Sequence, residues 1–182
     1  MSLKGEIHID GDRLWSSLME MAKIGATKKG GSCRLALTDE DRRGRDLFVT
    51  WCKEAKCDIH FDQLGNIFAR RPGKNKNAPP VVMGSHLDTQ PTGGRFDGVY
   101  GVLTGLEVIR TMNDNGIETE HPIEVVSWTN EEGSRFAPPM LASGVFSGVY
   151  DCHFALSRTD TDGRVFGEEL QRIGYAGVEP VG

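Results

Sequence analysis

The sequence predicts an α/β fold in which a mixed, mainly parallel sheet is covered by helices on both faces. Three segments support this prediction: an apolar run at 81–83, a helical apolar pattern over 99–109, and a second apolar run at 123–128. A strand, a helix and a strand of these lengths are typical of a right-handed parallel unit inside a helix-covered sheet. The 182 residues can bury one core and fit a single domain.

Two helices are expected before this unit. Asp10 or Asp12 is a suitable N-cap for the first helix, whose Leu14, Leu18 and Met21 share one face before Gly25 stops it. Residues 26–37 contain two adjacent glycines and no sustained period, so we expect a mobile loop there.

The second helix is expected to start after Thr38, which forms a capping-box pattern with Asp41. Its predicted apolar face is Leu47, Phe48, Trp51, Cys52 and Ala55. Neither of these two helices carries a pattern that indicates chemistry.

A hairpin is expected next, with strands around 59–61 and 67–69 joined by a turn at 64–66. The polar segment 71–80 then leads into the apolar run at 81–83, which is typical of a strand buried on both faces. In the helix that follows, Gly101 and Gly105 would allow close packing on the sheet. Beyond 140 we expect small-residue turns around 144 and 148, a short helix after Asp151 and another over 165–173.

Composition excludes several classes of partner. The formal net charge is -5 and the basic residues are scattered, so nucleic acid and anionic membranes are not expected to bind. Runs of eighteen apolar residues and the layout of a signal peptide are both missing from the sequence, which makes the cytoplasm the expected compartment. The four cysteines have no C-x-x-C spacing, so we interpret them as reduced thiols.

Five chemically capable side chains are expected to meet at one edge of the sheet. His86 and Asp88 follow the first strand of the unit, Glu131 and Glu132 follow the second, and Asp97 lies just before the helix. In open α/β sheets the ligand crevice lies beyond the carboxyl ends of the strands. Topology therefore predicts a site at this edge.

The residue types at this edge suit a metal site. His86 and Asp88 are two apart in an extended segment, so the carboxylate can accept the second N–H of a metal-binding imidazole. Helix N–H groups can hold the Asp97 carboxylate, whose two oxygens can bridge two cations. Glu131 and Glu132 point in divergent directions, so that one can bind a metal while the other remains a base.

Each of these residues also has a plain structural interpretation: a hydrogen-bonded histidine, a helix-capping aspartate and a solvated pair of glutamates. Their joint placement favours the functional interpretation. A nucleophilic triad built on Ser85 is disfavoured, because Ser85 should face away from His86 and the nucleophile-elbow motif is missing from the sequence.

The motifs GSHLDTQPTGGRFDG (84–98) and TNEEGSRF (129–136), with RLALTDEDRRGRDL (34–47), carry a family resemblance. The chain resembles the zinc-dependent amidohydrolases that include N-carbamoyl-L-amino-acid hydrolase, β-ureidopropionase and allantoate amidohydrolase. This family lies within the di-zinc aminopeptidase and aminoacylase clan. The resemblance implies a di-zinc exopeptidase-like catalytic domain.

The resemblance also implies roles for the five residues. His86 would bind one metal, Asp97 would bridge both metals and Glu132 would bind the second, while Glu131 acts as general base and Asp88 orients His86. The implied cofactors are two divalent ions, zinc in the first place, with manganese, cobalt or nickel as substitutes. The implied reaction converts an N-carbamoyl (ureido) amino acid, the small-molecule partner, into an amino acid, carbon dioxide and ammonia.

The chain also departs from the family. Its members are considerably longer, with a lid and dimerisation domain, and two further metal-binding histidines come from their later segments. His121 and His153 lie outside the matching motifs. Residues 1–182 are therefore expected to be the N-terminal part of the catalytic domain and to be inactive alone. A homodimer is implied for full-length members only.

Three alternatives stay open at this point. The chain could instead be part of an allantoate amidohydrolase, or part of a peptidase or deacylase of the same clan. It could also be a short, catalytically inactive module for binding or assembly.

Overall fold

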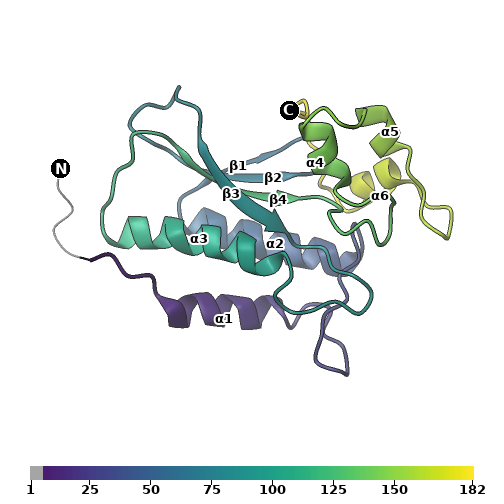
Figure 1. Cartoon of the computed structure of the whole chain (residues 1–182), viewed down its shortest axis with the longest axis horizontal. Helices are drawn as coiled ribbons and strands as arrows, with labels where there is room; N and C mark the ends of the chain where they lie inside the picture. The colour runs from purple at the N-terminus through teal and green to yellow at the C-terminus, as the bar shows by residue number, and fades with distance from the viewer. Residues whose placement is uncertain (1–5) are drawn as a thin grey trace.

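The structure, a computed structural model, describes residues 6–182, in which six helices and four strands are formed (Figure 1). In chain order these elements are α1 (Gly11–Met21), α2 (Asp39–Glu54), β1 (Asp58–Phe61), β2 (Ile67–Arg71), β3 (Val81–His86), α3 (Val99–Asp114), β4 (Ile123–Trp128), α4 (Leu141–Phe146), α5 (Cys152–Leu156) and α6 (Phe166–Arg172).

The four strands form one mixed sheet in the order β1-β2-β4-β3. β1 and β2 form the expected antiparallel hairpin, and β2 also pairs antiparallel with β4. β3 and β4 pair in parallel, with His86 in register with Trp128 at their carboxyl ends. The predicted α/β class and the parallel strand–helix–strand unit are confirmed, and this unit supplies the one parallel pair of these four strands, whose other two pairings are antiparallel.

Three helices lie on one side of the sheet, with α3 and α2 next to the strands and α1 packed against α3 (Figure 1). The predicted close approach of α3 is confirmed, since a Cβ added at Gly105 would lie 3.1 Å from the methyl groups of Val125. On the opposite face the covering is smaller: Phe146 of α4 packs on Phe68 and Trp128, with ring centroids 6.0 and 5.0 Å away.

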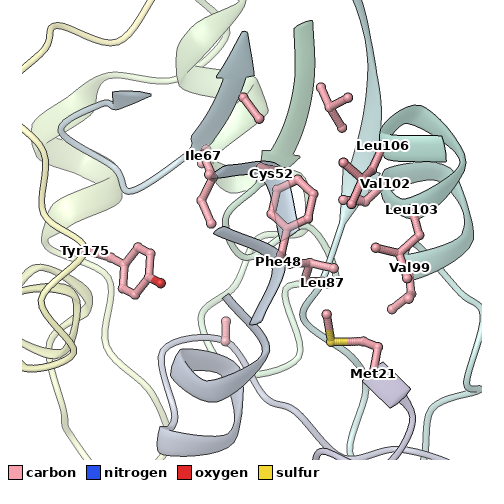
Figure 2. Close-up of a cluster of buried hydrophobic side chains, with 14 of the residues drawn as sticks. Met21, Phe48, Cys52, Ile67, Leu87, Val99, Val102, Leu103, Leu106 and Tyr175 are labelled. Carbon is pink, nitrogen blue, oxygen red and sulfur yellow. The ribbon is translucent and has the colours of Figure 1, made fainter. Parts of the chain in front are cut away.

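The main hydrophobic core fills the space between the sheet and these helices (Figure 2). Phe48 of α2 lies at its centre without exposure to solvent, with Cys52 one turn further on. The apolar face of α3 packs against them, and Leu87, directly after β3, extends the same core. The core therefore holds both helices against the strand ends that carry the site.

Helix starts follow the capping signals of the sequence. The Asp10 side chain accepts a hydrogen bond from the Arg13 amide at 2.9 Å, and α1 begins directly afterwards. Thr38 caps α2 in the same way by accepting from the Asp41 amide at 3.3 Å. The expected start of both helices is confirmed.

The expectation that residues 81–83 are buried on both faces is wrong. Val81 and Val82 are 56% and 49% exposed. The physical reason is the place of β3 in the sheet, because within residues 6–182 it pairs with β4 alone and forms an edge. An apolar run predicts a strand, but it does not predict the strand's neighbours.

Segment 26–37 also differs from the expected mobile loop, because much of it is pinned in place. Ser32 forms bridges with Ala26 and with Gly93, and Arg34 is completely buried.

The tail contains the two short helices that were expected, α5 and α6, and additionally α4 where only turns were expected. Among residues 6–182, every helix is too short or too polar to span a membrane.

The central position of Phe48 gives a stability prediction. Phe48→Ala should lower the free energy of unfolding by about 3–5 kcal/mol, because it removes a buried ring and leaves a cavity. Urea denaturation measures this change. Arg43→Ala, at an exposed position of the same helix, is the control and should change the value by less than about 0.5 kcal/mol. Equal effects of the two substitutions would contradict the assigned core.

Candidate active site at the carboxyl edge of the sheet

Two loops lie side by side at the carboxyl ends of β3 and β4. The first, 87–98, follows His86, and the second, 129–140, follows Trp128. Because the two strands are parallel and in register, both loops leave the same edge of the sheet. All five residues that the sequence singled out lie at this edge.

The His86 imidazole is 5% exposed and has its two nitrogens in different surroundings. Nδ1 lies 2.9 Å from the main-chain carbonyl oxygen of Asp88. A carbonyl can only accept, so Nδ1 carries a proton and donates to it, and in the neutral ring Nε2 then carries none. Nε2 faces the site, at 3.2 Å from Glu131 Oε2 and 3.9 Å from Asp97 Oδ1.

Gly98 allows α3 to start against this ring. Its φ is 67°, in the left-handed region that favours glycine. A Cβ at this position would lie 2.5 Å from three imidazole atoms of His86. Even the smallest side chain would therefore displace the histidine.

The Asp88 carboxylate is buried and joins the two loops. Its Oδ1 accepts a hydrogen bond from the Glu131 amide and its Oδ2 accepts one from the Glu132 amide, each at 3.3 Å. Burial raises the pKa of the Asp88 carboxyl to about 7, and the charge of Asp41 adds to this rise, while His86 and the two amides oppose it.

The contact expected between the Asp88 carboxylate and His86 is made differently in the structure. The carboxylate oxygen is 3.8 Å from Nδ1, whereas the main-chain carbonyl of the same residue is at hydrogen-bonding distance. The carboxylate is instead engaged with the backbone of the second loop.

Asp97 was expected to be held by helix N–H groups, and this expectation is wrong. The helix cap is Gly98, which has no side-chain hydrogen bond, and the Asp97 side chain is 62% exposed. Its carboxylate is therefore free to turn toward the site.

Glu132 has one oxygen in a hydrogen bond and one without a partner. Oε2 accepts from the side-chain amide of Gln90 at 3.0 Å, while Oε1 is buried and has no hydrogen-bond partner. Sequence reasoning missed Gln90, although it lies in the quoted motif two residues after Asp88.

Other residues that the sequence did not single out fix the start of the second loop. The Thr129 amide donates to the Asn66 side chain at 2.9 Å. Arg45 of α2 donates to the Thr129 hydroxyl at 3.2 Å and to the Asp41 carboxylate at 2.9 Å. A buried Arg–Asp pair at i, i+4 could have been noticed from spacing, but its loop partners could not.

The side chains at this edge are of the chemical types that bind divalent cations. Imidazole nitrogen and carboxylate oxygen are common ligands of zinc and similar ions. His86 Nε2 is open to the site, and Glu132 Oε1 is an orphaned buried oxygen that a cation would satisfy. Within residues 6–182, however, three or more such side chains are nowhere gathered closely enough to hold an ion as they stand.

The fold and the site together define the class of α/β domains that carry an imidazole and several carboxylates at the carboxyl edge of the sheet. Comparison with known proteins narrows this class. The sequence pattern described as Peptidase family M20/M25/M40 matches residues 82–169.

Two curated relatives are N-carbamoyl-L-amino-acid amidohydrolases. That of Rhizobium meliloti is 60% identical over 174 residues, which is 96% of this chain and 42% of the relative. That of Geobacillus stearothermophilus is 43% identical over 166 residues, which is 91% of this chain and 40% of the relative.

Among solved structures, a hydantoinase/carbamoylase family amidase from Burkholderia multivorans is 70% identical, with a TM-score of 0.96. The match covers 97% of this chain and 43% of that one. The chain is thus similar to hydantoinase/carbamoylase amidases over nearly all of its residues, and it spans about two fifths of the length of the curated relatives it matches.

The hydrogen bond of His86 gives a spectroscopic prediction. In the metal-free protein the neutral imidazole should be the Nδ1–H tautomer, which the ¹⁵N chemical shifts of the ring identify. Gly98→Ala should change these shifts, because its Cβ would displace the ring.

Gly94→Ala is the matched control, since a Cβ there meets nothing within 4 Å. An Nε2–H tautomer in the unmodified protein would contradict the assigned geometry.

Proposed function

We propose that this chain forms part of a metal-dependent amidohydrolase that hydrolyses the linear amide C–N bond of N-carbamoyl amino acids. The observation that carries the proposal is the open His86 Nε2, which faces the Glu131 and Asp97 carboxylates at the strand ends. The high identity to relatives named N-carbamoyl-L-amino-acid amidohydrolase supports the substrate class.

His86, Asp97 and Glu132 are the residues that would hold the metal, with Asp97 between two ions. When bound, two divalent ions supply a water of lowered pKa and polarise the scissile carbonyl. We infer zinc as the metal, and manganese, cobalt or nickel accept the same nitrogen and oxygen ligands.

Glu131 would act as general base. Its carboxylate is about one third exposed, so it can reach water at the mouth of the site. It takes one proton from the attacking water and delivers it to the leaving nitrogen of the amino acid. The released carbamic acid then decomposes, so that one water and one ureido acid give an amino acid, carbon dioxide and ammonia.

Asp88 prepares the site without touching the substrate. Its carboxylate holds the amides of Glu131 and Glu132, and its carbonyl fixes the tautomer of His86. Base and ligands are thereby oriented before substrate arrives, which is the main requirement for efficient proton transfer.

The site within this chain is proposed to be one wall of a larger one. Residues 6–182 bring a single histidine to the edge, whereas each of two zinc ions takes roughly four ligands. We therefore infer that further ligands come from polypeptide outside these residues, as part of the same catalytic domain, and that the chain alone does not turn over substrate.

Purified chain is expected to release no ammonia from N-carbamoyl-L-amino acids above background, with zinc, manganese, cobalt or nickel added. A coupled ammonia assay measures this. The idea of an incomplete site is wrong if the chain shows metal-dependent release that Glu131→Gln abolishes.

A chimera tests the roles of the residues directly. In it, this chain replaces the matched 174 residues of the Rhizobium meliloti relative. The chimera should hydrolyse N-carbamoyl-L-amino acids, and a chelator should remove that activity. Glu131→Gln should lower kcat by about 10²–10⁴-fold, the usual contribution of a general base.

Glu168→Gln, an exposed acid of α6, serves as control and should leave kcat unchanged. Assays with allantoate, N-acyl amino acids and dipeptides test the competing substrates. A folded, metal-loaded chimera that is inactive on every substrate would instead support a binding or assembly module.

A further inference from the structure

The loop that carries Glu131 and Glu132 contains no regular secondary structure of its own over 129–140. Asn130 and Met140 have positive φ angles of 54° each, a conformation that costs free energy in residues other than glycine. Such a loop keeps one conformation only when surrounding contacts determine it. The identity of those contacts therefore matters for the site.

Arg135 lies in the middle of this loop with a side chain that is 9% exposed. Each of its three guanidinium nitrogens donates to a different segment: Nε to Asp160 at 2.9 Å, Nη1 to the Ala36 carbonyl at 2.9 Å, and Nη2 to Glu169 at 2.7 Å. The guanidinium also lies over the Phe136 ring, 4.8 Å from its centroid. All donor nitrogens are thus occupied by groups of the protein.

Contacts within the loop transmit this anchoring to the site. The carbonyl of Phe136, next to Arg135, accepts from the Asn130 side chain at 2.7 Å. The carbonyl of Glu131 accepts from the Met140 amide at 2.6 Å. Hydrogen bonds therefore join the start of the loop both to its end and to the residue that follows Arg135.

The Ala36 contact also connects the second loop to the first. Two residues before Ala36, the Arg34 amide donates to the Thr89 hydroxyl at 2.7 Å, and the Thr89 amide donates to the Arg34 carbonyl at 2.9 Å. Thr89 directly follows Asp88. Segment 34–36 thus lies between the two loops and contacts both.

We propose that Arg135 is a positioning residue that fixes the Glu131–Glu132 loop relative to the His86–Asp88 loop. This inference rests on the proposed function for its catalytic meaning. Arg135 acts through the backbone, since its partners are Ala36, Asp160 and Glu169 and none of the five site residues. A lysine cannot replace it, because one ammonium group cannot reproduce a planar fork bound in three directions.

A purely structural role of Arg135 would have a different consequence for its substitution. Arg135 would then only anchor the tail segment through Asp160 and Glu169, and its loss would lower global stability without changing the loop. Hydrogen–deuterium exchange separates these cases, because it reports opening segment by segment.

The test compares Arg135→Lys with Arg164→Lys. Arg164 contacts the same Glu169 at 3.4 Å but is 58% exposed, which makes it a matched control. In Arg135→Lys the amides of residues 131 and 132 should exchange faster, while those of β4 and α3 keep their protection. Arg164→Lys should exchange like the unmodified chain.

A second readout, made in the chimera with the Rhizobium meliloti relative, is the affinity for Co²⁺, followed by its visible absorption. Arg135→Lys should bind Co²⁺ about 10–100-fold more weakly, the usual effect of losing a group that supports metal ligands. Arg164→Lys should bind it unchanged. Absence of Co²⁺ binding by the chimera with unmodified Arg135, with the exchange result as expected, would count against the proposed function and leave the positioning role supported.

Two outcomes would overturn the inference. The first is unchanged exchange at 131 and 132 in Arg135→Lys. The second is a loss of protection that spreads equally over β4 and α3, which would show an anchor of the fold and no specific effect on the loop.

Discussion

The organisation of the site depends on one buried carboxylate, that of Asp88. It accepts hydrogen bonds from the amides of Glu131 and Glu132, which lie 43 and 44 residues further along the chain. The main-chain carbonyl of Asp88 accepts a hydrogen bond from Nδ1 of His86. Removing the carboxylate would leave two partly buried amides without their partners, and an unpartnered amide costs about 1–3 kcal/mol where water cannot replace the partner. Asp88 therefore fixes the backbone at Glu131 and Glu132 together with the orientation of the His86 ring.

Helix α2 supports this arrangement with its polar face. Arg45 and Asp41 form a buried ion pair, and Arg45 also donates to the Gly65 carbonyl at 2.8 Å. Asp41 accepts from the Leu37 amide at 2.8 Å. Replacing such a pair by apolar residues is often neutral for stability, so its value is better sought in positioning. Here its contacts hold the turns and loops that surround the site.

Local signals of the sequence predicted much of the fold. The caps Asp10 and Thr38 and the close-packing Gly105 act through neighbours a few residues away or through the pattern of one helix, so the sequence reveals them. The parallel unit followed from its lengths, and it brought His86 and Glu131 to one edge. What failed depended on neighbours that are distant in sequence.

The exposure of Val82, for example, follows from the position of β3 at the edge of the sheet. An apolar run in the sequence does not predict the order of the strands. The role of Arg135 depends on a carbonyl 99 residues away. Gln90 and the free Asp97 carboxylate depend on loop conformations that single residue types do not determine.

The central proposal is that the two loops at the carboxyl edge form one wall of a metal site. Anomalous diffraction at the zinc absorption edge, from crystals of the chain grown with Zn²⁺, tests it most directly. An anomalous peak is expected about 2.0–2.1 Å from His86 Nε2, with Asp97 or Glu132 as a further ligand. Crystals whose zinc lies elsewhere, with His86 Nε2 bound only to protein groups or water, would contradict it.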